Sequence, residues 1–132
     1  MTVQERKLTS REVEALSSGA AEIVGGPPLI ETGGMLTIDL DAIAANWRAL
    51  AERVEPAECA AVVKADAYGC GLRETAGALA KAGCTTFFVA HIYEAKAVRE
   101  IAPNAIVYVL NGIPPGGASH FAAMRARPAG CR

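Results

Sequence analysis

The sequence predicts an α/β fold in which a parallel β-sheet is covered by helices. Three observations lead to this prediction. Apolar runs of strand length alternate three times with segments of helical periodicity, the connections between them are short, and the runs are almost free of polar residues, as in strands buried on both faces. Open doubly wound sheets and closed barrels both begin in this way, so periodicity leaves that choice open.

The first 34 residues are predicted to be a poorly ordered leader or linker. A short helix could form over residues 10–16, but the following segment, AAEIVGGPPLIETGG, is dense in Gly and Pro, which break regular structure. The charged start lacks the apolar core of a signal peptide, and no uncharged apolar run approaches the roughly 20 residues that span a bilayer. We therefore expect a cytoplasmic protein with no membrane partner.

The first strand and helix of the fold are expected over residues 35–54. The run MLTIDL (35–40) has the length and apolar content of a strand. Asp39 or Asp41 can cap the helix that follows by accepting backbone N–H bonds, and Pro56 ends that helix. The helix carries one apolar stripe at helical spacing, formed by Ile43, Trp47, Leu50 and Val54.

The rest of the chain is expected to alternate between buried strands and helices. Buried strands are predicted over residues 59–64, 85–90 and 105–110, and helices over about 72–82 and 92–101. Gly83 can end the first of these helices, and residues 65–71 are expected to form a loop. The tail MRARPAGCR lacks the apolar run of a fourth strand, so we expect no strand there.

Composition and charge exclude several classes of function. Hydrophobic residues make up 52% and charged residues 20% of the 132 residues, and the formal net charge is −1, so the chain is globular and offers no nucleic-acid surface. A complete (β/α)8 barrel typically takes about 250 residues, which is more than this chain has. The four cysteines form no C-x-x-C pair and have no His at metal-ligand spacing, so we expect reduced thiols and no metal site.

Lys64 is the strongest candidate for a catalytic residue. It closes an apolar strand directly before a loop, and in α/β folds the catalytic groups sit at the carboxyl ends of the strands. Desolvation favours the neutral amine, which is the form that Schiff-base formation with an aldehyde requires. A Lys that merely extends its amine to solvent at a strand end is the alternative, and position alone leaves both open.

Tyr68 lies four residues after Lys64 and begins the segment Tyr-Gly-Cys-Gly, which allows a tight turn close to a ligand. A phenol here can donate a hydrogen bond to a phosphate or a carboxylate; the alternative is an ordinary turn with a half-buried Tyr. His91 is expected to be a surface-loop residue, and we assign no role to His120. Cys70 lies next to the site, but nothing in the sequence indicates that it is reactive.

Four separated segments resemble, in order and spacing, the opening of alanine racemases. They are LTIDLDAIAANWRAL, AAVVKADAYGCGL, FFVAHIYEAKAVRE and VYVLNGIPPG, and together they cover about residues 35–124. The core signature is the segment VKADAYGCG over residues 63–71. The family commonly has Asn and His where this chain has Asp66 and Cys70, and neither difference touches Lys64 or Tyr68.

The resemblance implies the N-terminal part of a pyridoxal phosphate (PLP) binding (β/α)8 TIM-type barrel, with about three βα units present. In the family this barrel precedes a β-rich domain, and the enzyme is usually a homodimer. The resemblance also implies that Lys64 forms the Schiff base with PLP and that Tyr68 contacts the cofactor phosphate. The implied reaction interconverts L-alanine and D-alanine, which supplies D-alanine for peptidoglycan.

The resemblance places the second base of this reaction, a Tyr from the β-rich domain of a partner subunit, beyond Arg132. We therefore expect a truncated, inactive fragment, with a partial barrel domain over residues 35–124, an atypical tail over 125–132 and a doubtful dimer. The alternatives are a related PLP barrel, such as a decarboxylase, a D-amino-acid aldolase or a non-catalytic PLP carrier, and the product of a pseudogene.

Overall fold

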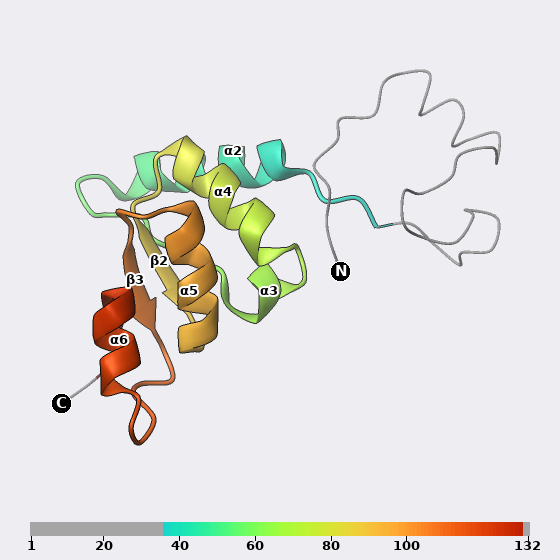
Figure 1. Ribbon diagram of the computed structural model, residues 1–132. Helices are drawn as coiled ribbons and strands as arrows, with labels where there is room; N and C mark the ends of the chain where they lie inside the picture. The colour runs from blue at the N-terminus through green and yellow to red at the C-terminus, as the bar shows by residue number, and fades with distance from the viewer. Residues whose placement is uncertain (1–35, 131–132) are drawn as a thin grey trace, which may run out of the picture. The chain divides into compact units, whose positions relative to one another are not determined.

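The computed structural model describes residues 36–130, and the leader expected over residues 1–34 lies outside them. From Asp39 onward the described residues form one compact unit around a parallel sheet (Figure 1). The order of the strands in this sheet follows the chain order. The strands are β1 (Ala61–Val62), β2 (Thr86–Val89), β3 (Ile106–Val109) and β4 (Ala126–Pro128). Parallel strands added one after another are the way a (β/α)8 wall is built, and the predicted fold class is confirmed.

Four helices form a layer beside the sheet. They are α2 (Leu40–Val54), α4 (Leu72–Ala82), α5 (Ile92–Ile101) and α6 (Ala118–Met124). Each helix packs against the next in chain order, and α5 also contacts both β2 and β3 (Figure 1). Three βα units are therefore present, as expected, with α4, α5 and α6 following β1, β2 and β3, and α6 is a helix that the sequence analysis does not predict.

The two faces of the sheet differ in their surroundings. Residues on the helix-covered face are buried: Ala61, Phe87, Val89, Val107 and Val109. The strand register places the next residues side by side in a row across the other face: Val62, Phe88, Tyr108 and Arg127. In this row the rings of Phe88 and Tyr108 stack with centroids 4.9 Å apart, and Arg127 donates a hydrogen bond of 3.2 Å to the Tyr108 hydroxyl. Val62 is 45% exposed, so the described residues leave this face open.

The strand expected over residues 35–40 is wrong. Residues 36–39 have no regular structure, and α2 begins at Leu40. Asp39 has extended dihedral angles, and its side chain accepts the N–H of Ala42 at 2.9 Å, so it caps the helix as one of the two predicted candidates. The apolar run signals burial of Leu40 within the helix, which periodicity cannot distinguish from a short strand.

The apolar stripe of α2 is correct only in its first half. Ile43 and Trp47 pack against the core, and the Trp47 indole N–H donates to the Cys59 carbonyl at 3.2 Å. Leu50 and Val54 are exposed in the second half of the helix. The helices predicted over 72–82 and 92–101 have the expected bounds, and Gly83 ends the former with a φ of 111°.

The expectation that the tail holds no strand is also wrong. Residues Ala126–Pro128 form β4 and pair with β3 in parallel. A strand at the side of a sheet needs backbone partners, and these do not depend on a run of apolar side chains. Ala126 packs against the core, while Arg127 lies over the Tyr108 ring with its guanidinium carbon 5.7 Å from the centroid.

Candidate functional site

Lys64 lies at the carboxyl end of β1, directly after the last residue that pairs in the sheet. That residue, Val63, is 1% exposed, and its N–H donates to the carbonyl of Phe88 at 2.9 Å. Lys64 itself is only partly buried. Because the strands are parallel, the loops after β1, β2 and β3 meet at the same edge, so Lys64 stands where an α/β fold builds its site.

The chain turns in an uncommon conformation immediately after Lys64. The expected loop is a short element, α3 (Lys64–Tyr68), in which Ala65, Asp66, Ala67 and Tyr68 all have φ between 52° and 56°. This is the left-handed helical region, which costs an L-residue roughly 1–2 kcal/mol because Cβ approaches the following carbonyl oxygen. Four successive residues other than glycine in this region make the segment a strained left-handed turn.

Several hydrogen bonds hold the left-handed turn. The N–H of Gly69 donates to the carbonyl of Ala65 at 3.1 Å, and the N–H of Gly71 donates to the carbonyl of Asp66 at 3.0 Å. The Asp66 side chain then accepts the N–H of Leu72 at 2.7 Å, so it caps the first turn of α4. The difference between this chain and the family pattern at residue 66 therefore leaves an oxygen acceptor in place, since Asn also offers one.

The left-handed turn places the two predicted site residues next to each other. Tyr68 is 65% exposed, and its ring centroid lies 5.9 Å from the Lys64 Nζ. A primary amine and a phenolic hydroxyl thus share one side of the loop after β1. An aldehyde that carries an anionic group would find both of its partners here.

Glu94 is a residue of this edge that the sequence analysis did not single out. It lies in the first turn of α5 and is 3% exposed. Its Oε1 accepts the N–H of Ala65 at 2.8 Å, and its Oε2 accepts those of Ala90 at 2.7 Å and His91 at 3.0 Å. Glu94 therefore joins the loop after β1 to the loop after β2. A Glu at the third position of a predicted helix signals such a capping role, but it does not reveal the bond to Ala65.

The loops after β2 and β3 contribute two exposed polar side chains at this edge, His91 and Asn111. The His91 ring stacks on Tyr93 with centroids 5.9 Å apart, and the Asn111 Nδ2 lies 3.2 Å from the His91 Nε2. His91 is exposed, as expected of a surface-loop residue, and His120 is exposed on α6. Cys70 is a free thiol that packs against the core.

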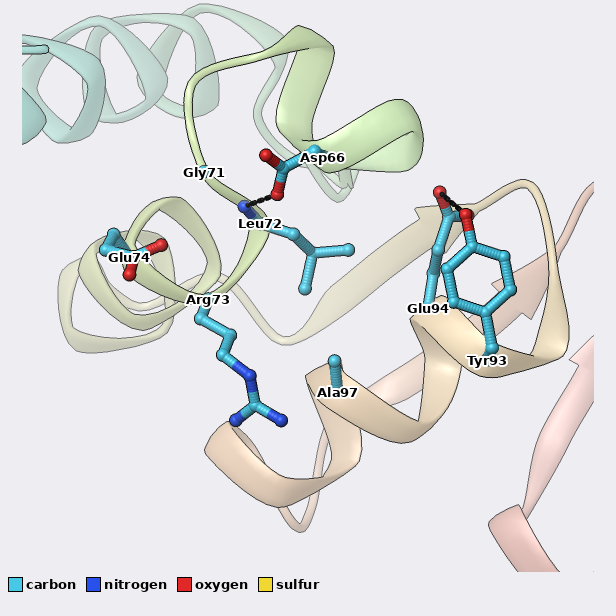
Figure 2. A pocket seen from close by; sticks show the side chains of 8 residues that line it. All are labelled: Asp66, Gly71, Leu72, Arg73, Glu74, Tyr93, Glu94 and Ala97. Carbon is cyan, nitrogen blue, oxygen red and sulfur yellow. Dashed lines mark hydrogen bonds between the residues drawn. The ribbon is translucent and has the colours of Figure 1, made fainter. Parts of the chain in front are cut away.

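A cavity of about 440 Å³ opens behind the left-handed turn, between the first turns of α4 and α5. Figure 2 shows Asp66, Arg73 and Glu74 on one side of it and Tyr93, Glu94 and Ala97 of α5 on the other. Lys64 and Tyr68 do not line it. The candidate site is therefore the carboxyl edge of the sheet, where Lys64 lies. The cavity lies beside it and is lined by Asp66 and Glu94, whose hydrogen bonds hold the loop after β1.

The described residues contain neither a metal site nor a membrane-spanning helix. Within residues 36–130, no group of three or more His, Cys, Asp or Glu side chains is arranged to hold a metal ion. No helix in the same part of the chain has the length and apolar content needed to cross a membrane.

The chain is similar to a known family over most of its described residues. The profile of the family "Alanine racemase, N-terminal domain" matches residues 38–129. An alanine racemase of Methylobacterium nodulans is 59% identical over 96 residues, which is 73% of this chain and 26% of that protein. An alanine racemase of Brucella ovis is 52% identical over 88 residues, or 66% of this chain and 22% of that protein. The chain thus spans about a quarter of the length of these relatives.

Solved structures give the same result for the fold. The structure of alanine racemase from Bartonella henselae with covalently bound pyridoxal phosphate superposes with a TM-score of 0.67 at 48% identity, over 69% of this chain and 26% of that one. The alanine racemase of E. faecalis superposes with a TM-score of 0.65 at 32% identity, over 69% of this chain and 25% of the other.

Proposed function

This chain belongs to the alanine racemase N-terminal domain family, and we propose that Lys64 is its PLP-binding lysine, in an enzyme that interconverts L-alanine and D-alanine. The observation that carries the proposal is the position of Lys64 at the carboxyl end of β1, with the Tyr68 ring 5.9 Å from its amine. The Bartonella henselae structure, with its covalently bound pyridoxal phosphate, supports it. A covalent link to an aldehyde requires an amine of this kind.

The residues at the loop edge fit this cofactor chemically. The Lys64 amine can condense with the aldehyde, and the Tyr68 hydroxyl can donate a hydrogen bond to the phosphate. The stacked rings of Phe88 and Tyr108 supply an apolar surface on the open face of the same sheet. When it is bound, PLP supplies an electron sink that stabilises negative charge at the α-carbon of an amino acid.

The chain's own contribution to the reaction is proton transfer on one side of the substrate. The neutral Nζ of Lys64 can accept the α-proton from that side and can return a proton to it. Racemisation requires a second base on the opposite side. We assign that role to a tyrosine of a partner subunit, so that homodimer formation and a substrate of alanine size belong to the proposal.

The activity is proposed for a whole protein that contains this segment, because the chain spans about a quarter of its relatives. By themselves the 132 residues are proposed to be inactive, since they supply one base of the two. D-Alanine supply for peptidoglycan and a cytoplasmic location are the proposed cellular setting. A decarboxylase, an aldolase or a PLP carrier is less well supported, because the relatives compared above are alanine racemases.

The proposal is tested by joining residues 36–130 to the remaining part of the Bartonella henselae racemase and measuring D-alanine formation from L-alanine. We expect Lys64→Ala to lower the rate at least about 10²–10⁴-fold, the effect of losing a positioned acid–base group. Lys81→Ala is the matched control, since Lys81 lies in the last turn of α4, and it should keep the rate. An active Lys64→Ala protein would contradict the proposal.

A further inference from the structure

We propose that Glu94 is a positioning residue for Lys64, which fixes the peptide bond after Lys64 and thereby the direction of the Lys64 side chain. This inference rests on the proposed function of Lys64. Glu94 acts through the backbone, because its two carboxylate oxygens accept three backbone N–H groups; Oε1 also accepts the Tyr93 hydroxyl at 3.5 Å.

The contact lies at the peptide bond that matters most for Lys64. Glu94 Oε1 accepts the N–H of Ala65 at 2.8 Å, and that N–H belongs to the peptide unit that begins with the Lys64 carbonyl. The orientation of this unit sets ψ of Lys64 and φ of Ala65, which is 52°. A bond at this point therefore determines where the chain leaves β1 and enters the left-handed turn.

The other carboxylate oxygen of Glu94 is bonded to the backbone just after β2, so the Glu94 side chain is itself held in place. Oε2 accepts the N–H groups of Ala90 and His91, which follow β2 directly. Strand β2 is in turn paired with β1, and Val63 donates to Phe88 just before Lys64. Because Glu94 is 3% exposed, water competes little for these bonds, and hydrogen bonds to an ionised acceptor are stronger than those between neutral groups.

The strained backbone explains why such a bond is needed. A run of left-handed residues persists only when its surroundings determine it from several sides. Asp66 fixes the far end of the turn through its bond to Leu72, and Glu94 fixes the near end at Ala65. Without the near bond, Ala65 can return to the ordinary φ region, and Lys64 then loses its fixed direction.

The substitution Glu94→Gln tests this arrangement with little change in volume. A Gln side chain has one acceptor oxygen, so it cannot accept the N–H groups of both loops. Its oxygen can serve the two donors after β2, and its NH₂ group then faces the Ala65 N–H. The variant thus removes the bond next to Lys64 and leaves the helix start bonded.

The measurement uses the 132-residue chain, PLP and borohydride, with mass mapping of the modified lysines. In the unaltered chain Lys64 should be modified faster than Lys81 and Lys96. In Glu94→Gln we expect Lys64 modification to fall roughly tenfold, the factor for losing a hydrogen bond to a charged acceptor, with Lys81 and Lys96 unchanged. Glu58→Gln is the matched control, because Glu58 bonds to Thr85 and Thr86 at the start of β2. It should leave the Lys64 rate unchanged.

Two results would overturn the proposal. One is an unchanged Lys64 rate in a folded Glu94→Gln chain; the other is an equal fall at Lys64, Lys81 and Lys96, which would show a structural role only. If the variant does not fold, hydrogen exchange of the unaltered chain decides, because the Ala65 amide must then exchange about as slowly as that of Val63. Fast hydrogen exchange of the Ala65 amide would refute the proposed bond between Glu94 and Ala65. Slow Lys64 modification with a protected Ala65 amide would refute the proposed function instead.

Discussion

The two ends of the sheet are held in different ways. At the amino end, Glu58 accepts hydrogen bonds from the hydroxyl groups of Thr85 at 2.7 Å and Thr86 at 2.6 Å, which joins the approach to β1 with the start of β2. Arg99 donates to the carbonyls of Ala105 and Arg125, which precede β3 and β4. Glu58 is exposed, and among the residues that these bonds reach only Arg125, which ends α6, has a positive φ, of 48°.

At the carboxyl end, a buried carboxylate holds a strained backbone. Glu94 binds three backbone N–H groups in two loops, and one of the loops continues as the left-handed turn after Lys64. Helix α5 supplies the bonds at both ends, Glu94 from its first turn and Arg99 from its last. Strain of this kind lowers stability. Four successive left-handed residues lie at the carboxyl end, against the single Arg125 at the amino end, and this difference supports the proposed site at the carboxyl end.

The largest expected effect on stability is the difference between substitutions of Glu94 and of Glu58. Glu94→Ala should lower the free energy of unfolding by about 3 kcal/mol, because it leaves buried N–H donors without an acceptor. Glu58→Ala should lower it much less, because water can replace an exposed carboxylate. Urea unfolding followed by the fluorescence of Trp47 measures both. Equal losses would remove the distinction between the ends.

A substitution of Arg99 tests whether the amino end of the sheet affects stability without affecting Lys64. It also donates to the carbonyls of Met124 and Pro103, so Arg99→Met removes several bonds while keeping much of the apolar stem. We expect a loss of about 1–2 kcal/mol in unfolding free energy, since the carbonyls are partly accessible to water. The rate of Lys64 modification should not change. A fall in that rate would show that the amino end also controls the site.

A smaller effect of opposite sign is expected within the left-handed turn. Ala65→Gly should raise the free energy of unfolding by up to about 1 kcal/mol, because Gly adopts a positive φ without the Cβ contact. Ala45→Gly is the matched control in an exposed position of α2, where the same change should cost about 1 kcal/mol. Thermal unfolding compares the two variants. A loss at both positions would argue against the left-handed conformation.

The smallest effect concerns pH at the amino end. Hydrogen bonds from Thr86 and then Thr85 lower the pKa of Glu58 below its ordinary value of 4.5. A lowered folded-state pKa stabilises the fold above the unfolded pKa, and this contribution is lost as the pH falls through the folded value. Urea midpoints measured from about pH 6 downward should therefore fall less steeply below about pH 4.5 in Glu58→Gln than in the unaltered chain. Identical slopes would contradict the bonds to Glu58.

Sequence periodicity predicted the parts of the fold that depend on local pattern. The helices at 72–82 and 92–101 and the strands around Phe87 and Val107 follow from apolar spacing, and Lys64 follows from its place after a buried strand. The missed β4 depends on backbone pairing with β3, and the missing strand before Leu40 shows that a short apolar run fits either element.

The residues of the candidate site could be predicted from the sequence, but their arrangement in space could not. Lys64 and Tyr68 carry the signature, yet Ala65 and Ala67 as residue types disfavour a left-handed turn and only Asp66 tolerates one readily. Tertiary contacts therefore impose the turn. The role of Glu94 depends on a bond to a residue 29 positions earlier. The position of Glu94 in the helix indicates only that it bonds to the backbone at the start of α5.

The most direct test of the central assignment is the identity of the lysine that holds PLP. The unaltered chain is incubated with PLP, reduced with borohydride, digested and analysed by mass spectrometry. We predict that the modified peptide contains AVVKADAYGCG with the added mass on Lys64, and that Lys64→Ala abolishes that peptide without labelling another lysine in its place. Modification spread evenly over Lys64, Lys81 and Lys96, or retained after Lys64→Ala, would contradict the assignment.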